Sequence, residues 1–367
     1  MRENSKSERL FCLDALRGLD MLLLTVVGPF FMAVNKGYGL PEGVLAQFRH
    51  PWGGFTLWDI IMPLFIFMCG AAVPFGLGRR MVDGRAGRRY LGHVLSRFAL
   101  LWVLGMVAQG RLLTLDPLKI SPFNNTLQTI ACGYLIAACV WLVRPAWLRR
   151  LVPLALAVGY ALVLHLCGDY SKFGNAAIRF EHWFVPLVMP TGTKAVELAD
   201  PLYSWWLTIP MFGMMTLCGM EATLILTGAG TKVRKALTVA GLGAALLAAG
   251  WALASVVPPI KQIFTVSFTA QAMGWSCLAL ASLYALTDIL MFRRGWWLVT
   301  LFGQTALMAY MCIEVFGGTF DAFAAQVTQG IGRWTGPAFA PVAHWFAVSA
   351  LLVFVLVARR DMRRVKG

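Results

Sequence analysis

The sequence predicts an all-α integral membrane protein, a polytopic bundle of about ten transmembrane helices with both termini in the cytoplasm. Composition is the first indication, because 59% of the 367 residues are hydrophobic and only 13% are charged, whereas a soluble domain carries roughly 25% charged residues. The second is the mean hydropathy of +0.68. The third is the pattern of long apolar runs separated by short basic clusters. Most of the surface is therefore expected to contact lipid.

The apolar runs give the predicted helices in chain order. A helix needs roughly 20 mostly apolar residues to cross the hydrocarbon core of a bilayer. We expect such helices over residues 18–35, 56–78, 97–114, 125–143, 148–166, 203–226, 236–256, 266–289, 296–316 and 340–358. No internal repeat or low-complexity tract interrupts this series in the sequence. Residues 1–367 are therefore predicted to form a single membrane domain.

Basic residues set the predicted orientation of these helices. With the amino terminus inside, 23 of the 32 lysines and arginines fall in the cytoplasmic segments, as the positive-inside rule requires. An even number of helices also returns the basic carboxy terminus to the cytoplasm. The net charge of +15 is thus explained by topology, and a nucleic-acid partner is not expected. Anionic membrane lipid or an anionic cofactor at the inner face is a secondary possibility.

Three further features of the sequence limit the interpretation: the outer loops, the amino-terminal segment and the cysteines. The first outer loop covers residues 35–55 and the longest covers residues 167–203, and loops of this length commonly cap a site. The amino-terminal segment has no small-residue cleavage site, so we expect the first helix to stay in the membrane. The eight cysteines have no metal-ligand spacing, which predicts neither a metal site nor a disulfide framework.

Polar residues within the apolar runs are candidates for a site, because ionisable groups at membrane depth usually face a bundle interior or a wet cavity. Interhelical hydrogen bonding is the competing structural explanation. Asp14 and Arg17 are three residues apart, so they share a helix face and can pair at the membrane interface. The other polar residues at membrane depth are Asp20, Asp59, Asn125, Gln128, Glu221, Gln271, Gln304 and Glu314.

His50 has the most suggestive position of the five histidines. It lies where the first outer loop returns to the membrane, before the turn-forming sequence PWGG and then Asp59. A neutral imidazole at this position can act as a general base or a nucleophile. The other histidines are more simply explained by solvated or structural roles. From these residues alone, a transporter and a membrane enzyme remain equally open.

Three segments resemble the heparan-α-glucosaminide N-acetyltransferase family, and together they cover most of the chain. The most specific is LDALRGLDMLLL followed by HPWGGFTLWDIIMPLFIFMCG. The family pattern falls there on Asp14, Arg17, Gly18, Asn35, His50, Trp52, Thr56, Asp59, Met62, Pro63 and Phe65. The segment FNNTLQTIACGY contains Asn125 and Gln128, with Thr129 where the family commonly has arginine. The third, PPIKQIFTVSF to GQTALMAYMCIEVF, contains Lys261, Ser267, Gln304, Tyr310 and Glu314.

The resemblance implies a transmembrane acyltransferase domain over residues 1–367. Acetyl-CoA in the cytosol would be the donor, and an amino sugar such as glucosamine, or a glycan hydroxyl, would be the acceptor on the periplasmic side. Departures from the family, including a longer loop between Asn35 and His50, leave the acceptor open. The chain is similar to bacterial members, which implies a multi-pass protein of the bacterial inner membrane. A homodimer is compatible with the family, and no metal is implied.

The resemblance also implies roles for individual residues. The family's active histidine falls on His50, which would either carry the acetyl group or deprotonate the acceptor. Asn35 would hold the thioester carbonyl, and Asp59 would orient His50 or bind the sugar. Substrate- or cofactor-binding roles are expected for Asp14, Arg17, Trp52, Asn125, Gln128, Lys261, Ser267, Gln304 and Glu314. The CoA phosphates suit the arginine-rich inner face, at Arg79, Arg80, Arg88 or Arg89.

Two other classes of function compete with this interpretation. A secondary transporter for a sugar or related small molecule would need no acyl-transfer chemistry. Transporters often have inverted repeats and helices broken near the membrane midplane, but the sequence has no evident repeat and its strongest motif lies at an outer edge. A purely structural or partner-binding membrane protein would leave the interior polar residues unexplained.

Overall fold

The computed structural model describes residues 10–81, 87–188 and 203–365. This part of the chain contains nine helices that are long and apolar enough to cross a membrane, and the apolar helix Thr126–Trp141 is shorter. The nine are Phe11–Tyr38, Leu57–Leu77, Arg88–Ala108, Ala146–Cys167, Ile209–Thr227, Lys232–Leu253, Val266–Ile289, Ala306–Thr328 and Ala340–Met362. The prediction of a polytopic helical membrane protein is confirmed, whereas the side of the membrane on which each terminus lies stays a prediction.

Several of these membrane helices contain more than one helical element. The first consists of α1 (Phe11–Leu22), the π-helix η1 (Leu23–Val27) and α2 (Gly28–Tyr38). The remaining elements are α3 (Glu42–Ala46), η2 (Leu57–Ile60), α4 (Ile61–Ala71), α5 (Val73–Leu77), η3 (Gly78–Arg80), α6 (Arg88–Ala108), η4 (Leu112–Thr114), α7 (Thr126–Trp141), α8 (Ala146–Cys167), α9 (Ala176–Val188), α11 (Ile209–Thr227), α12 (Lys232–Leu253), α13 (Val266–Tyr284), η5 (Ala285–Ile289), α14 (Trp297–Gln304), α15 (Ala306–Thr328), α16 (Ile331–Thr335) and α17 (Ala340–Val365).

The chain forms two compact units. Unit 1 comprises Met1–Leu40, Ala229–Ala240 and Leu278–Gly367, and unit 2 comprises Pro41–Gly228 and Gly241–Cys277. Helices α12 and α13 contribute residues to both units. Whether the two units act as the single domain predicted over residues 1–367 stays a prediction.

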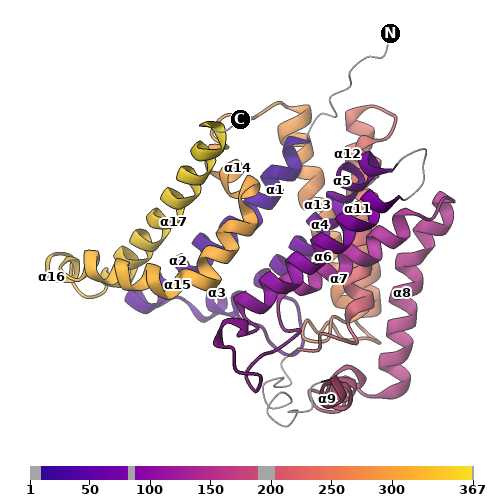
Figure 1. The fold of residues 1–367 in the computed structure, drawn as a ribbon, viewed down its shortest axis with the longest axis horizontal. Helices are drawn as coiled ribbons and strands as arrows, with labels where there is room; N and C mark the ends of the chain where they lie inside the picture. The colour runs from indigo at the N-terminus through magenta and orange to yellow at the C-terminus, as the bar shows by residue number, and fades with distance from the viewer. Residues whose placement is uncertain (1–9, 82–86, 189–202, 366–367) are drawn as a thin grey trace. The chain divides into compact units, whose positions relative to one another are not determined.

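Unit 2 is organised around α11, which packs against α4, α7 and α8 (Figure 1). Glycines bring the backbones of α4 and α11 into direct contact. A Cβ atom added to Gly70 would lie 1.7 Å from the Thr216 carbonyl oxygen, and one added to Gly219 would lie 1.9 Å from the Phe67 carbonyl oxygen. Small residues at such contacts are typical of helix pairs in membranes. This contact supports α4, whose preceding turn carries Asp59.

Unit 1 contains a second contact of the same kind, between α1 and α14. A Cβ atom on Gly18 would lie 1.8 Å from the Val299 carbonyl oxygen, and one on Gly303 would lie 2.0 Å from the Asp14 carbonyl oxygen. Helix α17 packs along α15 and also against α2 (Figure 1). The Trp345 side chain donates a hydrogen bond of 2.8 Å to the Val26 carbonyl oxygen, which satisfies an acceptor in the π-helix η1.

The boundaries of two predicted helices differ most from the structure. The helix expected over residues 97–114 is α6, which begins at Arg88 and ends at Ala108, so Arg97 lies inside the helix. Its guanidinium lies 4.6 Å from the centre of the Tyr134 ring, and this cation–π contact compensates a charge placed within the helix. The helix expected over residues 296–316 is interrupted at Thr305, which has φ −118° and ψ 19°.

The long outer loops also contain helices that the sequence analysis did not predict. Helix α3 (Glu42–Ala46) lies in the first loop and α9 (Ala176–Val188) lies in the longest. Asn175 precedes α9, and its side-chain oxygen accepts a hydrogen bond of 2.8 Å from the Ile178 backbone, as an N-cap residue does. Residues 189–202 of that loop lie outside the described residues.

Candidate active site

The loop that carries His50 is closed by hydrogen bonds between its two ends, and all of its partners belong to unit 2. The Trp58 backbone donates to the Gln47 carbonyl oxygen at 3.0 Å, and the Leu57 backbone donates to the Gln47 side chain at 3.2 Å. The Thr56 hydroxyl donates to the Arg49 carbonyl oxygen at 3.1 Å. These contacts hold residues 50–54 (HPWGG) in a closed turn directly before η2 and α4.

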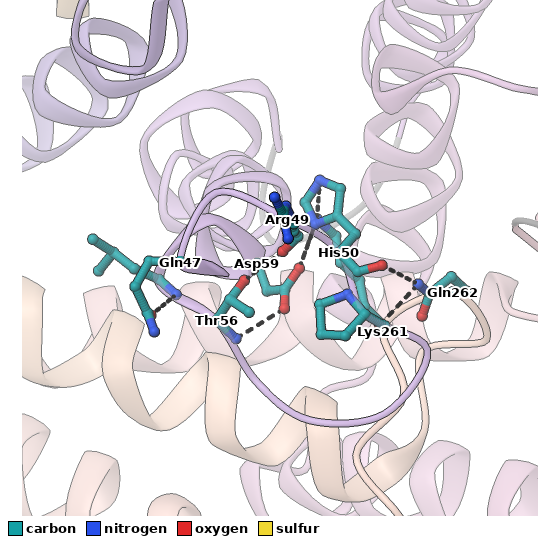
Figure 2. A network of polar contacts seen from close by, with 9 residues as sticks. Gln47, Arg49, His50, Thr56, Asp59, Lys261 and Gln262 are labelled. Atoms are coloured by element: carbon teal, nitrogen blue, oxygen red, sulfur yellow. Dashed lines mark hydrogen bonds and ion pairs between the residues drawn. The ribbon is translucent and has the colours of Figure 1, made fainter. Parts of the chain in front are cut away.

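Asp59 uses its two carboxylate oxygens for different partners (Figure 2). Oδ2 accepts a hydrogen bond of 2.9 Å from the Thr56 backbone, which fixes the side chain against the start of η2. Oδ1 lies 2.6 Å from His50 Nδ1. A carboxylate only accepts hydrogen bonds, so this contact places the imidazole proton on Nδ1. The lone pair of a neutral His50 is then on Nε2 and is available for reaction.

Lys261 completes the cluster from a distant part of the sequence. Its Nζ atom lies 3.2 Å from Asp59 Oδ1, 3.1 Å from His50 Nδ1 and 3.4 Å from His50 Nε2. Burial lowers the pKa of Lys261 to about 8, although the negative charge of Asp59 acts in the opposite direction. An amine with this pKa both gives and takes protons near neutral pH.

The segment before α13 holds Lys261 in place through Thr265. The Thr265 hydroxyl donates to the Pro258 carbonyl oxygen at 2.9 Å and accepts from the Ile260 backbone at 2.9 Å. It also lies 3.3 Å from the hydroxyl of Ser267, which is fully buried. Ser267 therefore supports the turn that presents Lys261, and its predicted role in binding substrate or cofactor stays a prediction.

The three side chains differ in exposure in a way that suits catalysis. The His50 side chain is 34% exposed, whereas that of Asp59 is 2% exposed and that of Lys261 is 6% exposed. The imidazole can therefore meet a reactant while its two charged partners remain shielded from water. Shielding strengthens their electrostatic effect on any charge that develops at His50.

Gln262 is a site residue that the sequence analysis missed. Its side-chain nitrogen donates to the carbonyl oxygens of His50 at 3.2 Å and Pro51 at 3.1 Å. Figure 2 shows these contacts of Gln262. The Gly54 backbone also donates to the Pro259 carbonyl oxygen at 2.9 Å, so the two loops are joined at two places. A glutamine next to a lysine gives no pattern by which the sequence could indicate this contact.

Other predicted site residues of unit 2 make contacts that stabilise loops. The Trp52 side chain donates to the Tyr170 carbonyl oxygen at 3.0 Å. The Asn125 side chain accepts from the Leu127 backbone at 2.7 Å and caps α7. The Gln128 side chain donates to the Pro122 carbonyl oxygen at 2.5 Å and accepts from the Asn124 backbone. Their predicted binding roles stay predictions.

Five predicted site residues lie in unit 1. The Arg17 guanidinium is 3.5 Å from Asp14 Oδ1, so the pair expected from their spacing is present. The Asn35 side chain accepts a hydrogen bond of 3.0 Å from the Leu40 backbone, at the end of α2. Gln304 is the last residue of α14 and is exposed, and Glu314 is half-buried in α15. None of their predicted binding roles is tested.

The arginines predicted to bind phosphate lie in η3 and at the start of α6. Arg80, Arg88 and Arg89 are exposed, and Arg80 donates to the Gly76 carbonyl oxygen. The side chain of Arg79 lies outside the described residues. Within residues 10–81, 87–188 and 203–365, no three His, Cys, Asp or Glu side chains form a group able to hold a metal ion. A reaction without metal stays a prediction.

The chain is similar to two curated acetyltransferases. It is 27% identical to the heparan-α-glucosaminide N-acetyltransferase of Mus musculus over 137 residues, which cover 36% of this chain and 19% of the mouse protein. It is 21% identical to the enzyme of that name from Homo sapiens over 370 aligned residues, which cover 85% of this chain and 54% of the human protein.

The similarity of the chain to these two proteins is distant and covers only part of their length. The matched region spans about half the length of the human relative, and no protein-family model matches the chain. The two matches agree with the family that the motifs around His50 resemble. The chain is thus a distant relative of the mammalian heparan-α-glucosaminide N-acetyltransferases.

Proposed function

We propose that the protein is a transmembrane acetyltransferase that transfers an acetyl group from cytosolic acetyl-CoA to an amino sugar or glycan on the periplasmic side. The observation that carries the proposal is the cluster of His50, Asp59 and Lys261. An accessible imidazole, oriented by a buried carboxylate and flanked by a buried amine, is an arrangement suited to acyl transfer. The distant similarity to N-acetyltransferases supports the same reaction class.

In the covalent route, His50 receives the acetyl group before the acceptor does. Nε2 attacks the thioester carbonyl carbon, a C–N bond forms, and the C–S bond breaks as the CoA thiolate leaves and takes up a proton. The acceptor amine then attacks the acetyl carbon, the C–N bond to Nε2 breaks, and the amine loses a proton. Asp59 stabilises the positive charge that develops on the imidazole, as a buried carboxylate beside Nδ1 does.

In the direct route, His50 acts as a general base and never carries the acetyl group. Nε2 removes a proton from the acceptor amine or hydroxyl while that atom attacks the thioester. In either route Lys261 is close enough to His50 to donate a proton to the departing thiolate or to a developing oxyanion. An oxyanion donor contributes roughly 3 kcal/mol, and Asn35 is our candidate for a second one.

The remaining predicted residues are assigned by their chemistry. The exposed arginines Arg80, Arg88 and Arg89 would attract the phosphates of CoA at the inner face. Trp52, beside His50 in sequence, offers an aromatic surface for a sugar ring. Asp14, Arg17, Asn125, Gln128, Ser267, Gln304 and Glu314 would line or support the path between donor and acceptor. We propose that the enzyme lies in a bacterial inner membrane, surrounded by lipid, and that it forms a homodimer.

Transfer of label from radiolabelled acetyl-CoA to a panel of amino sugars tests the proposal, using purified protein in detergent. We expect wild-type transfer to fall by at least about a hundredfold in His50→Ala, because general base and nucleophilic contributions are of that size. Asn35→Ala should fall less. Label trapped on wild-type protein before acceptor is added supports the covalent route.

His344 gives a matched control for the loss of a histidine. Its Nε2 atom lies 3.2 Å from Asp321 Oδ1, and its side chain is 35% exposed, so it resembles His50 in pairing and accessibility. His344→Ala should retain acetyl transfer. Absence of any transfer or acetyl-CoA binding by wild-type protein would reject the acetyltransferase.

A carrier without acyl-transfer chemistry is the second candidate, and features of unit 1 favour it. A cavity of about 750 Å³ lies among α2, α15 and α17, with His344 and Asp321 among its lining residues. The π-helix η1 and the break at Thr305 interrupt two of the helices, as occurs in transporters. Uptake of labelled glucosamine by proteoliposomes without acetyl-CoA, lost in His344→Ala but not in His50→Ala, would establish the carrier.

A further inference from the structure

Glu181 is a buried acid in α9 that neither the motifs nor the proposed chemistry uses. It is 2% exposed, and three donors from one short segment converge on its Oε2 atom. They are the Ser204 hydroxyl at 3.3 Å, the Trp205 backbone at 3.4 Å and the Trp206 backbone at 3.3 Å. A single carboxylate oxygen therefore holds the chain just before α11.

The segment held by Glu181 is connected to the loop that carries His50. The Ser204 backbone donates a hydrogen bond of 3.0 Å to the Gln262 carbonyl oxygen. The Gln262 side chain in turn donates to the carbonyl oxygens of His50 and Pro51. Every link in this series belongs to unit 2, and the series leads from Glu181 to the backbone of His50.

The same segment approaches the cluster through Tyr203. Burial and the negative charge of Asp59 raise the pKa of Tyr203 to about 12. Its ring stacks on that of Trp205, with centroids 5.4 Å apart. The backbone held by Glu181 therefore also carries a side chain that interacts electrostatically with Asp59.

We propose that Glu181 is a positioning residue for the His50 site, whose carboxylate holds residues 203–206 against Gln262 so that the imidazole keeps its reactive orientation. The inference rests on the proposed acetyltransferase function. Glu181 itself does not touch the reacting atoms. Its effect passes through Ser204 and Gln262, so it depends on how strongly Oε2 accepts hydrogen bonds.

The protonation state of Glu181 controls how firmly the segment is held. Burial raises the pKa of Glu181 to about 7, against the opposing effect of its hydrogen bonds to Trp206, Trp205 and Ser204. When the segment opens and water reaches the carboxylate, this pKa returns toward its ordinary value, so the closed arrangement binds the proton more tightly than the open one. The closed segment is therefore most stable below about pH 7, and ionisation of the buried acid above that pH favours opening. The loop around His50 should then be ordered in mild acid and loosened in mildly alkaline conditions.

The groups that face Glu181 do not themselves change charge in this range. Among the described residues, Tyr160 on α8 lies close enough to Glu181 to interact electrostatically with it, and its hydroxyl donates to the Ile263 carbonyl oxygen at 2.5 Å. The segment packed on the carboxylate contributes only Ser204 and two tryptophan amides. A change in the segment near pH 7 would therefore reflect the titration of Glu181.

Hydrogen–deuterium exchange of the full-length protein in detergent tests the positioning without requiring catalysis. After correction for the intrinsic pH dependence, we expect amides of residues 204–206 in wild type to exchange about fivefold faster at pH 8 than at pH 6. Glu181→Gln, which resembles the protonated acid, should exchange slowly at both pH values, whereas Glu181→Ala, which removes the acceptor, should exchange rapidly at both. Asp169→Asn is the matched control, because Asp169 is a solvent-facing acid that bonds only locally to Ser171.

The acetyl-transfer rate supplies the second measurement. The ratio of the wild-type rate to the Glu181→Gln rate should approach one at pH 5.5 and be lowest at pH 8, where the ionised acid of the wild type favours opening of the segment. An unchanged exchange rate at residues 204–206 across pH in wild type, or equal transfer rates at every pH, would overturn the positioning role. If wild type transfers no acetyl group, the proposed function fails while the exchange result still decides the role of Glu181.

Discussion

Asp59 is the residue on which both the local fold and the proposed chemistry depend. Its Oδ2 atom fixes the start of η2 through Thr56, and its Oδ1 atom contacts His50 and Lys261. A substitution that keeps the shape but removes the charge separates these functions. The amide oxygen of asparagine can still accept from Thr56, whereas the orientation and charge of the imidazole are no longer controlled.

We therefore expect Asp59→Asn to fold and to lose about a hundredfold or more of the acetyl-transfer rate, the size of an acid–base contribution. The measurement is transfer from labelled acetyl-CoA, with the thermal midpoint of unfolding as a check on folding. Asp321→Asn, which alters the other histidine–aspartate pair, should retain the rate. A fully active Asp59→Asn would exclude the oriented imidazole.

The buried carboxylate of Glu181 should lower the free energy of unfolding at neutral and alkaline pH. Its folded pKa of about 7 lies above its ordinary value of 4.5, so the folded state binds the proton more tightly than the unfolded state. The stability associated with this group is complete below the unfolded pKa and is lost as the pH rises through about 7, a loss of about 3 kcal/mol. Glu181→Gln should raise the Tm by several degrees at pH 8 and change it little at pH 5. A lower Tm at pH 8 would contradict this.

The sequence predicted part of the site because some of its residues form a local pattern. His50 and Asp59 stand nine residues apart beside a turn, and Lys261 was included through the resemblance of its segment to the family. Gln262 and Glu181 were missed because their importance comes from contacts across long sequence separations. Asn125 and Gln128 stand out in an apolar run, yet their contacts stabilise a helix start and its preceding loop.

At the scale of elements, the glycine contacts decide how closely helices approach. Gly70 and Gly219 allow the backbones of α4 and α11 to touch, with no side chain between them. Gly76, in α5, has nothing within 4 Å of the position that a Cβ atom would occupy. Two helical glycines in the same membrane segment thus have opposite environments.

The same substitution should have opposite effects at the two positions. Gly70→Ala should destabilise the protein by about 1–3 kcal/mol or more, because overpacking forces the helices apart. Gly76→Ala should be neutral or stabilising by up to about 1 kcal/mol, because alanine has the higher helix propensity. Thermal unfolding of the two variants in one detergent measures the difference, and equal midpoints would show that the α4–α11 contact is not tightly packed.

Helix positions were predicted where hydropathy alone determines them. The expected helix over residues 266–289 matches Val266–Ile289, and that over residues 56–78 matches Leu57–Leu77. The start of α6 was missed because Arg97 resembles a loop residue until its contact with Tyr134 is known. The break at Thr305 has no proline to indicate it, and the Thr305 hydroxyl donates a hydrogen bond to the Leu301 carbonyl oxygen.

At the scale of the whole molecule, the predicted topology makes opposite ends of the helices chemically distinct. The site around His50 belongs to the predicted outer ends, and the exposed arginines belong to the predicted inner ends. Two exposed cysteines allow the predicted orientation of the helices to be tested. Cys139, near the end of α7, and Cys167, at the end of α8, are exposed, whereas the other six cysteines are buried.

A membrane-impermeant maleimide should therefore label Cys167 and leave Cys139 unlabelled in intact cells. A permeant maleimide should label both, and the variants Cys139→Ser and Cys167→Ser identify each modified site by mass spectrometry. The inverse pattern would place His50 on the cytoplasmic side and remove the need for transfer across the membrane. Labelling of neither residue by the permeant reagent would mean that lipid covers both thiols.

The closeness of Lys261 to His50 creates a hazard of self-modification in the proposed covalent route. An acetyl group on His50 Nε2 would form within about 3.4 Å of the Lys261 amine. Transfer of the acetyl group to Lys261 Nζ would give a stable amide and an inactive enzyme. The negative charge of Asp59 opposes the lowering of the Lys261 pKa by burial, so most of the amine is protonated at neutral pH and a protonated amine is not a nucleophile. In this view Asp59→Asn should accumulate acetylated Lys261, detectable by peptide mass spectrometry, and the carboxylate serves as a safeguard of the enzyme's working lifetime.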